Sequence, residues 1–289
     1  MNRALIRLFR PKQWIKNSFL AAPIIFSGKF TDPRSLLRVG ILIVIYCLLS
    51  SAIYAVNDVL DHRADRLHPA KRSRPVASGA VSVKTALTWA VILLGGGLII
   101  AFQLGPAVYL PAAVFVVLSL TYQKLWKKIF ILDVIAIAAG FLLRAWAGAI
   151  GIGVAASPWF LLSTGLLALF LGFAKRRHEL IKLGTKSSAH RPVLANYSLA
   201  YLDQLINSLL AASIVTYSLW AFNFGKGNSP PYMMLTIPVV IYALYRYLHL
   251  IYRPDGEDGA ENIVLADPPL LASIGLWTVA SATIIKLFY

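Results

Sequence analysis

Carboxylates at helical spacing are the side chains of this sequence best placed to do chemistry. Asp58, Asp61 and Asp65 fall on one face if the apolar segment Gly40–Val56 before them continues as a helix. Like charges on one stripe close to hydrocarbon repel one another, and a divalent cation would remove that cost. Mg²⁺ favours a few carboxylates together with the oxygens of a substrate phosphate. We therefore predict an Mg²⁺ site at these three residues; the alternative is a solvated helix end with ordinary loop charges.

Basic residues accompany this cluster in two places. The first set follows it directly and consists of Lys71, Arg72 and Arg74. The second set follows a later apolar segment and mixes basic, polar and acidic residues, namely Lys175, Arg176, Arg177, Glu179, Arg191, Tyr197 and Asp203. Arginine gives bidentate contacts to phosphate and lysine gives a point charge, so both sets suit a substrate with several phosphates. The alternative for the Lys-Arg-Arg run is a basic anchor at the inner end of a membrane helix.

Arg144 lies in the middle of an apolar segment. It follows Asp133 by eleven residues, which is close to three helical turns and about 16 Å along a helix, so both side chains face one way. An ionisable residue at such depth usually faces a cavity or a partner charge. We expect Arg144 to line a polar cavity that reaches inward from the inner face; the alternative is a structural ion pair.

The elements that must position these residues are membrane helices. Hydrophobic residues make up 58% of the 289 positions and charged residues only 14%, far from the balance of soluble proteins. A spanning helix needs roughly 20 mostly apolar residues. The sequence therefore predicts an all-α polytopic membrane protein with nine transmembrane helices, at about Trp14–Phe30, Gly40–Asn57, Lys84–Gln103, Pro106–Tyr122, Phe130–Ile152, Pro158–Ala174, Leu202–Phe224, Tyr232–Ile251 and Pro268–Leu287.

The distribution of charge predicts the topology. Twenty-two of the 28 lysines and arginines fall on the same side of these spans as the N-terminus, and five fall on the other side. An excess of Lys and Arg marks cytoplasmic loops. The N-terminus is therefore expected in the cytoplasm, and all but one of the 12 acidic residues map to that same inner side.

The overall composition narrows the class of protein further. The net charge of +16 needs no nucleic-acid partner, because topology and an anionic inner leaflet account for most of it. The single cysteine, Cys47, excludes an intrachain disulfide. Residues 1–289 are expected to form a single integral membrane domain. Within it, residues 1–13 place Arg3, Arg7 and Arg10 on one face and predict a short interfacial helix.

These motifs resemble those of the UbiA-type intramembrane prenyltransferase superfamily. Its Asn-Asp-x-x-Asp-x-x-x-Asp motif after span two is complete here from Asn57 to Asp65. Typical members carry a further pair of aspartates after span six, where this chain has Lys-Arg-Arg-His-Glu instead. The finer resemblance is to the branch that transfers phosphoribose to polyprenyl phosphates, and it is carried by the stretches Arg10–Asn17, His68–Gly79, Lys175–Leu180 and Asp267–Leu270.

The resemblance implies an enzyme of the bacterial plasma membrane with its active site on the cytoplasmic face. Its reaction would transfer 5-phosphoribose from phosphoribosyl pyrophosphate to a decaprenyl or other polyprenyl phosphate, for cell-wall arabinan synthesis. Mg²⁺ would neutralise the departing pyrophosphate, and Asn57 would orient a carboxylate or a metal-bound water. The acceptor phosphate is already an anion and needs no general base. Lys16 and Asn17 are further candidates for diphosphate or ribose contacts.

Two other functions stay open at the level of sequence. A UbiA-type enzyme of the usual kind would move a prenyl chain from prenyl diphosphate to an aromatic acceptor, and the missing second aspartate pair counts against it. An anion transporter would be favoured by inverted repeats with matching broken helices, and none is convincing here. The sequence also leaves open the acceptor chain length and the oligomeric state. A homo-oligomer is compatible with it.

Overall fold

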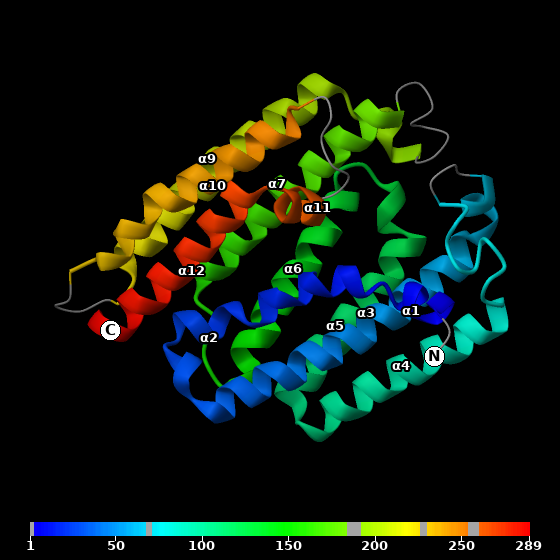
Figure 1. Cartoon of the computed structure of the whole chain (residues 1–289), viewed down its shortest axis with the longest axis horizontal. Helices are drawn as coiled ribbons and strands as arrows, with labels where there is room; N and C mark the ends of the chain where they lie inside the picture. Colours follow the sequence, from blue (N-terminus) through cyan, green and yellow to red (C-terminus); the bar gives the residue numbers. More distant parts are fainter. Residues whose placement is uncertain (1–2, 68–70, 184–191, 226–229, 254–259) are drawn as a thin grey trace.

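The computed structural model describes residues 3–67, 71–183, 192–225, 230–253 and 260–289, and their regular structure is entirely helical (Figure 1). The long helices are α3 (Pro33–Leu67), α4 (Val83–Gln103), α5 (Pro106–Lys124), α6 (Leu132–Gly151), α7 (Pro158–Leu183), α9 (Leu199–Asn223), α10 (Ile237–Ile251) and α12 (Pro268–Phe288). The short ones are α1 (Arg3–Phe9), η1 (Pro11–Leu20), α2 (Ala22–Phe26), η2 (Lys29–Thr31), η3 (Trp126–Lys128), η5 (Pro192–Asn196), η6 (Tyr232–Thr236) and α11 (Ala260–Ala266).

Eight of the nine predicted spans are confirmed as segments long and apolar enough to cross a membrane. The first predicted span, Trp14–Phe30, is instead a broken segment in which a ten-residue 3₁₀ helix, η1, precedes the five-residue α2. Pro23 accounts for the break, because a proline inside a continuous helix would clash with the carbonyl four residues before it. At about 2.0 Å per residue for a 3₁₀ helix and 1.5 Å for an α-helix, the two pieces together reach roughly 27 Å.

The N-terminal segment is docked on the bundle. Helix α1 ends at Phe9, and Leu8 is fully buried in an apolar cluster formed with α3 and α4. Arg10 then takes up a left-handed backbone conformation, φ 51°, before η1 begins. The predicted interfacial helix over residues 1–13 is therefore an α-helix only to Phe9; Leu8 and Phe9 are covered by protein, whereas Ile6 is exposed.

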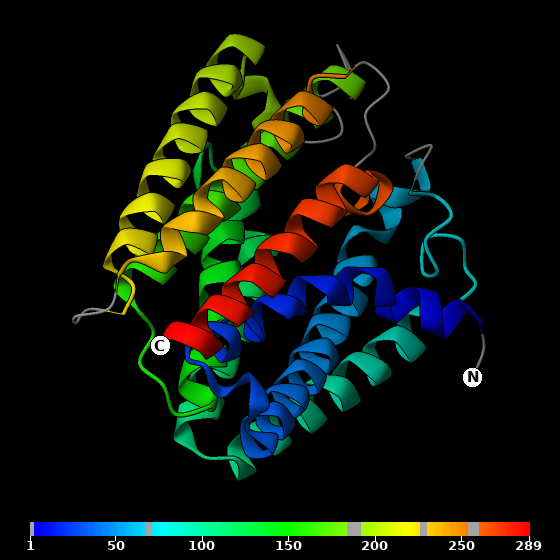
Figure 2. The ribbon, with the colours of Figure 1, turned by 60° about the vertical axis from the view of Figure 1, so that its left-hand side comes forward.

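The long helices form two groups that meet along α6 and α7. Helices α3, α4, α5 and α6 pack against one another, and α7 packs on both α6 and α9, while α10 packs on α12 (Figures 1 and 2). The N-terminal segment η1–α2 contacts α3 and α6, and α2 also reaches α12. We call the first set the N-terminal group and α7, α9, α10 and α12 the C-terminal group.

Helix α3 carries the aspartates beyond the apolar part of the bundle. It runs unbroken for 35 residues, or about 52 Å, whereas the hydrocarbon core of a bilayer is about 30 Å thick. The polar end of α3 is held by the following loop, in which Arg66 donates a hydrogen bond to the Ala77 carbonyl at 3.1 Å. We refer to this end of the molecule as the aspartate end.

Glycines set the spacing of α6 against its neighbours. A Cβ on Gly148 would lie 2.3 Å from the Leu20 carbonyl oxygen, so only glycine lets α6 come this close to η1. On the other side, Gly165 of α7 lies against Leu142, and Gly172 lies against Val134. Because α6 and α7 are antiparallel, this register sets Ser163 level with Arg144.

Candidate functional site

The three aspartates lie on one face of α3, as their spacing predicts, and each is paired with a basic side chain. Asp58 forms an ion pair with Arg10, and Arg74 bonds Asp65 at 2.6 Å. Arg74 also lies 3.8 Å from Asp58, so it bridges two of the three acids. Asp61, the most exposed of them, accepts a hydrogen bond from Lys127 of η3 at 3.1 Å.

The atoms next to these ion pairs fit a metal ion. Asn57 Oδ1 and Asp58 Oδ2 are buried and have no hydrogen-bond partner. Buried oxygen acceptors are rarely left unsatisfied, and Mg²⁺ is commonly bound by one or two protein oxygens plus substrate phosphates. Among the described residues, no three acidic, histidine or cysteine side chains converge into a ready-made site. The full ligand set of Asp58, Asp61 and Asp65 therefore stays a prediction.

A second polar network lies at the same end, on α6 and α7. The Arg176 guanidinium is 1% exposed and donates to Asp133 Oδ2 at 2.7 Å and to Glu179 Oε2 at 2.6 Å. The Tyr197 hydroxyl donates to the other Asp133 oxygen at 2.8 Å. Burial and the Asp133 carboxylate raise the pKa of Tyr197, so it remains a hydrogen-bond donor at neutral pH. Arg176 is thus fixed by two carboxylates on different helices.

Lys71 connects the aspartates with this second network. Burial, followed by the charge of Arg74, lowers the pKa of the Lys71 ammonium, while Asp65, Glu179 and Asp61 oppose that shift. Lys71 thus interacts electrostatically with carboxylates of both α3 and α7. The assignment of the loop after α3 and the end of α7 to one site stays a prediction.

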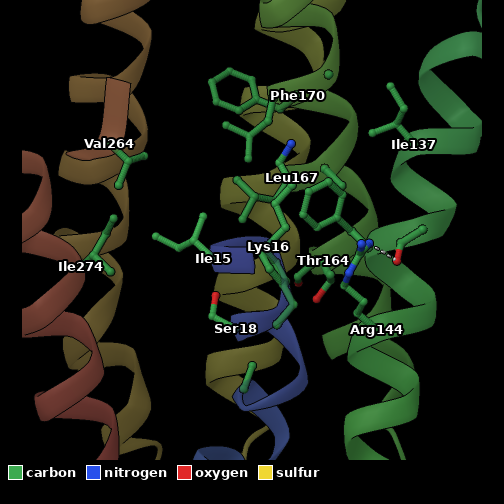
Figure 3. Close-up of a pocket in the computed structure, with 18 of the residues that line it drawn as sticks. Ile15, Lys16, Ser18, Ile137, Arg144, Thr164, Leu167, Phe170, Val264 and Ile274 are labelled. Atoms are coloured by element: carbon green, nitrogen blue, oxygen red, sulfur yellow. Dashed lines mark hydrogen bonds between the residues drawn. The ribbon is translucent and has the colours of Figure 1, made fainter. Parts of the chain in front are cut away.

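A cavity of about 960 Å³ lies between the two groups of helices and reaches from Asn57 down into the bundle. Its wall is mostly apolar and aromatic. The basic side chains Lys16, Arg144, Lys175 and Arg176 line it, and no acidic side chain does among the described residues. Figure 3 shows Lys16 on the ribbon of η1 and Arg144 on that of α6. The chamber, as we call it, combines an apolar volume with positive charge and is suited to an amphipathic anion.

Arg144 lies in the chamber wall and is only 7% exposed, although this wall is mostly apolar and not polar as predicted. Its Nε donates to Asn17 Oδ1 at 2.9 Å. Its Nη1 donates to the Gly140 carbonyl, also at 2.9 Å (Figure 3). The guanidinium also lies over the ring of Phe115, 4.4 Å from its centre. No described carboxylate lies within ion-pair distance, so the structural ion pair considered as an alternative is not present among the described residues.

Other predicted residues lie outside this arrangement. Arg177 bonds Asp203 at 2.6 Å and stacks on Tyr252, so this pair joins α7 to α9 and α10 and does not line the chamber. Arg72 is exposed in the loop after α3. Arg191 falls outside the described residues. The Asp-Pro-Pro-Leu motif is a helix start, because Asp267 accepts a hydrogen bond from the Leu270 amide and caps α12.

Three residues of the site were not among the sequence candidates. Arg10, Lys127 and Asp133 hold Asp58, Asp61 and Arg176 respectively. Arg10 stood in one of the stretches that carry the family resemblance, so a signal for it existed. Lys127 and Asp133 come from a different loop and helix, and only the packing of η3 and α6 brings them to the site.

Comparison with known proteins agrees with this fold. The family model described as the UbiA prenyltransferase family matches residues 18–266. The Decaprenyl-phosphate phosphoribosyltransferase of Corynebacterium glutamicum is 33% identical over 280 residues, covering 94% of this chain and 84% of that protein. The protein of the same description from Mycobacterium tuberculosis is 34% identical over 284 residues, covering 96% and 93%.

Solved structures show the same fold at lower identity. The structure of a UbiA homolog from Archaeoglobus fulgidus bound to GPP and Mg2+ superposes with a TM-score of 0.76 at 17% identity, covering 98% of this chain and 100% of that one. The all-helical membrane fold expected from the sequence is therefore confirmed. With a family model that spans most of its length and relatives matched nearly end to end, this chain belongs to the UbiA prenyltransferase family.

Proposed function

We propose that this protein transfers 5-phosphoribose from phosphoribosyl pyrophosphate to a polyprenyl phosphate, such as decaprenyl phosphate, with Mg²⁺ and release of pyrophosphate. The relatives that match nearly the whole chain carry the corresponding description. We place the active site on the cytoplasmic face of a bacterial plasma membrane and assign the product to cell-wall arabinan synthesis, as predicted from the sequence.

One observation carries the proposal, namely the chamber between the helix groups. Four basic side chains and no described acidic one line a largely apolar cavity of about 960 Å³. A long-chain phosphate needs both the apolar volume and the positive charge, because its tail must leave water while its head stays paired. A prenyl diphosphate donor would also fill such a cavity, and Lys175 and Arg176, which stand where typical members of the superfamily carry aspartates, favour the phosphoribosyl reaction.

Different residues would bind the pyrophosphate and the 5-phosphate of the donor. Asn57 and Asp58 would hold the metal, which when bound supplies positive charge to the departing pyrophosphate. Arg74 and Arg10, already beside Asp58, are placed to contact the same phosphates. Lys175 and Arg176 face the chamber and supply cations for the 5-phosphate of the donor. The acceptor phosphate attacks the anomeric carbon of the ribose as an anion, without deprotonation by the protein.

The test uses purified protein in lipid nanodiscs with donor labelled in the ribose. We expect the label to enter the lipid extract with a polyprenyl phosphate and Mg²⁺, and not after chelation with EDTA. A parallel reaction with a prenyl diphosphate and an aromatic acceptor examines the usual reaction of the family. Transfer in that second reaction, with none in the first, would overturn the proposal.

A further inference from the structure

Arg144 is a buried cation for which the described part of the protein provides no counter-charge. The ionisable side chains nearest to it are Tyr46, Cys47 and Tyr54, and none of them is a carboxylate. An arginine in the interior of a membrane protein is costly unless it pairs with an anion or faces a polar cavity. Because Arg144 lines the chamber, the missing anion has access to it from there.

The contacts of Arg144 orient its charge toward the aspartate end. The bond from Nη1 to the Gly140 carbonyl folds the side chain back by one helical turn. Gly140 lies seven residues after Asp133, or about 10 Å along the helix. The Arg144 guanidinium therefore lies deeper in the chamber than Asp133 and the second polar network.

A hydroxyl group without a hydrogen-bond partner lies in the chamber wall at the level of Arg144. Ser163 Oγ is buried, has no hydrogen-bond partner and lies on a residue that lines the chamber. The register between α6 and α7 sets Ser163 level with Arg144, and Figure 3 shows the next residue, Thr164, beside Arg144. A buried donor without a partner, level with a buried cation without a counter-charge, is what a phosphate oxygen would satisfy.

Lys16 adds a second positive charge from η1. A 3₁₀ helix eclipses residues three apart, so Asn17 and Leu20 form a buried row while Lys16 and Phe19 form the neighbouring row that lines the chamber. Lys16 Nζ donates to Gln13 Oε1 at 2.5 Å. The bond from Arg144 to Asn17 holds the adjacent buried row. Arg144 and Lys16 thus place two positive charges in the chamber wall.

We propose that Arg144, Lys16 and Ser163 form a subsite for the phosphate of the lipid acceptor, distinct from the donor site at the aspartate end. The ligand class is a phosphate monoester carried on an apolar chain. This inference rests on the proposed function and adds which residues receive which phosphate. It separates the acceptor phosphate, inside the chamber, from the 5-phosphate and diphosphate of the donor.

The experiment measures the preference of the protein for a lipid phosphate over the matching alcohol. Farnesyl phosphate and farnesol compete for binding in detergent without donor, and the ratio of their affinities reports the phosphate contact alone. A hydrogen bond to a charged group is worth roughly tenfold to a hundredfold in affinity, so Arg144→Gln should reduce that ratio at least tenfold. The half-saturating concentration of phosphoribosyl pyrophosphate should stay within about twofold, because the donor phosphates lie elsewhere.

Two further variants serve as a second test and as a control. Ser163→Ala disturbs no described contact and should reduce the ratio roughly threefold, which covers the case in which Arg144→Gln fails to fold. Arg246→Gln is the matched control, since it removes an arginine that pairs with Asp267 outside the chamber, and its ratio should equal that of the wild type.

An unchanged ratio in both Arg144→Gln and Ser163→Ala would overturn the subsite. A rise in the donor requirement equal to the loss of lipid-phosphate preference would also overturn it, because it would assign Arg144 to the donor. The binding assay contains no donor, so it tests the subsite independently of the reaction. Failure of phosphoribosyl transfer would count against the proposed function only.

Discussion

Replacing Asp133 by asparagine tests the reasoning about the buried network of α6 and α7. Asp133 is fully buried and accepts from Arg176 and Tyr197. Asparagine has one acceptor oxygen, so one of the two donors would face an amide N–H group. The change also leaves Arg176, at 1% exposure, with Glu179 as its remaining described carboxylate partner.

The expected loss follows from burial. Removing one partner of a buried ion pair costs about 3–5 kcal/mol, and the surviving Glu179 contact puts Asp133→Asn at the lower end, about 3 kcal/mol. Glu179 is 25% exposed, and its removal in Glu179→Gln resembles the loss of a surface pair, at about 1 kcal/mol or less. Stability would be measured as the free energy of unfolding in mixed micelles titrated with SDS, followed by circular dichroism.

A double variant completes the cycle. Asp133→Asn with Arg176→Gln removes both buried charges, so it should recover part of the stability lost in Asp133→Asn alone. The reasoning is refuted if the double variant loses the sum of the two single losses. It is also refuted if Glu179→Gln destabilises the protein as much as Asp133→Asn does.

Three other changes have defined outcomes. Asp58→Asn should abolish Mg²⁺-dependent binding of phosphoribosyl pyrophosphate, measured by calorimetry with and without the metal; undiminished binding would remove Asp58 from the metal site. Lys175→Ala should raise the half-saturating donor concentration severalfold, whereas Lys182→Ala, two turns along α7, should not; equal effects would assign both to general electrostatics. Asp267→Ala should cost about 1–2 kcal/mol through loss of the α12 cap. The Arg246 hydrogen bond lowers the pKa of Asp267, so this contribution is present at neutral pH and lost as the pH falls through the lowered pKa, below 3.8, and a pH series on the unfolding midpoint measures it.

The sequence predicted most of the fold because a membrane span is a local signal. Eight apolar stretches became spans, and the i, i+3, i+7 spacing placed Asp58, Asp61 and Asp65 on one face of a helix that continues through them. The first span was predicted as a continuous helix but is a broken segment, because hydropathy does not distinguish a 3₁₀ helix from an α-helix. Pro23 was the available signal.

The site was predicted less completely because its partners come from distant parts of the chain. Arg144 was expected to line a polar cavity, and it lines a cavity whose wall is mostly apolar. Its bond to Asn17 joins residues 127 positions apart, and no spacing rule reports such a contact. Arg177 shows the opposite case, since it belongs to the same basic run as Arg176 but turns to the other side of α7 and pairs with Asp203.

The 3₁₀ segment η1 has a consequence for which changes of length the N-terminal region can tolerate. Trp14 donates to Ser51 and Asn17 donates to Cys47, so two successive residues of one row are attached to α3. In a 3₁₀ helix each residue turns the chain by about 120°, so one inserted or deleted residue would rotate every later side chain into the next row. A substitution in η1 would disturb the contacts of one residue, whereas a single-residue insertion would turn Lys16 and Asn17 away from their places together. We therefore expect homologous chains to keep the length of this segment fixed even where its composition varies.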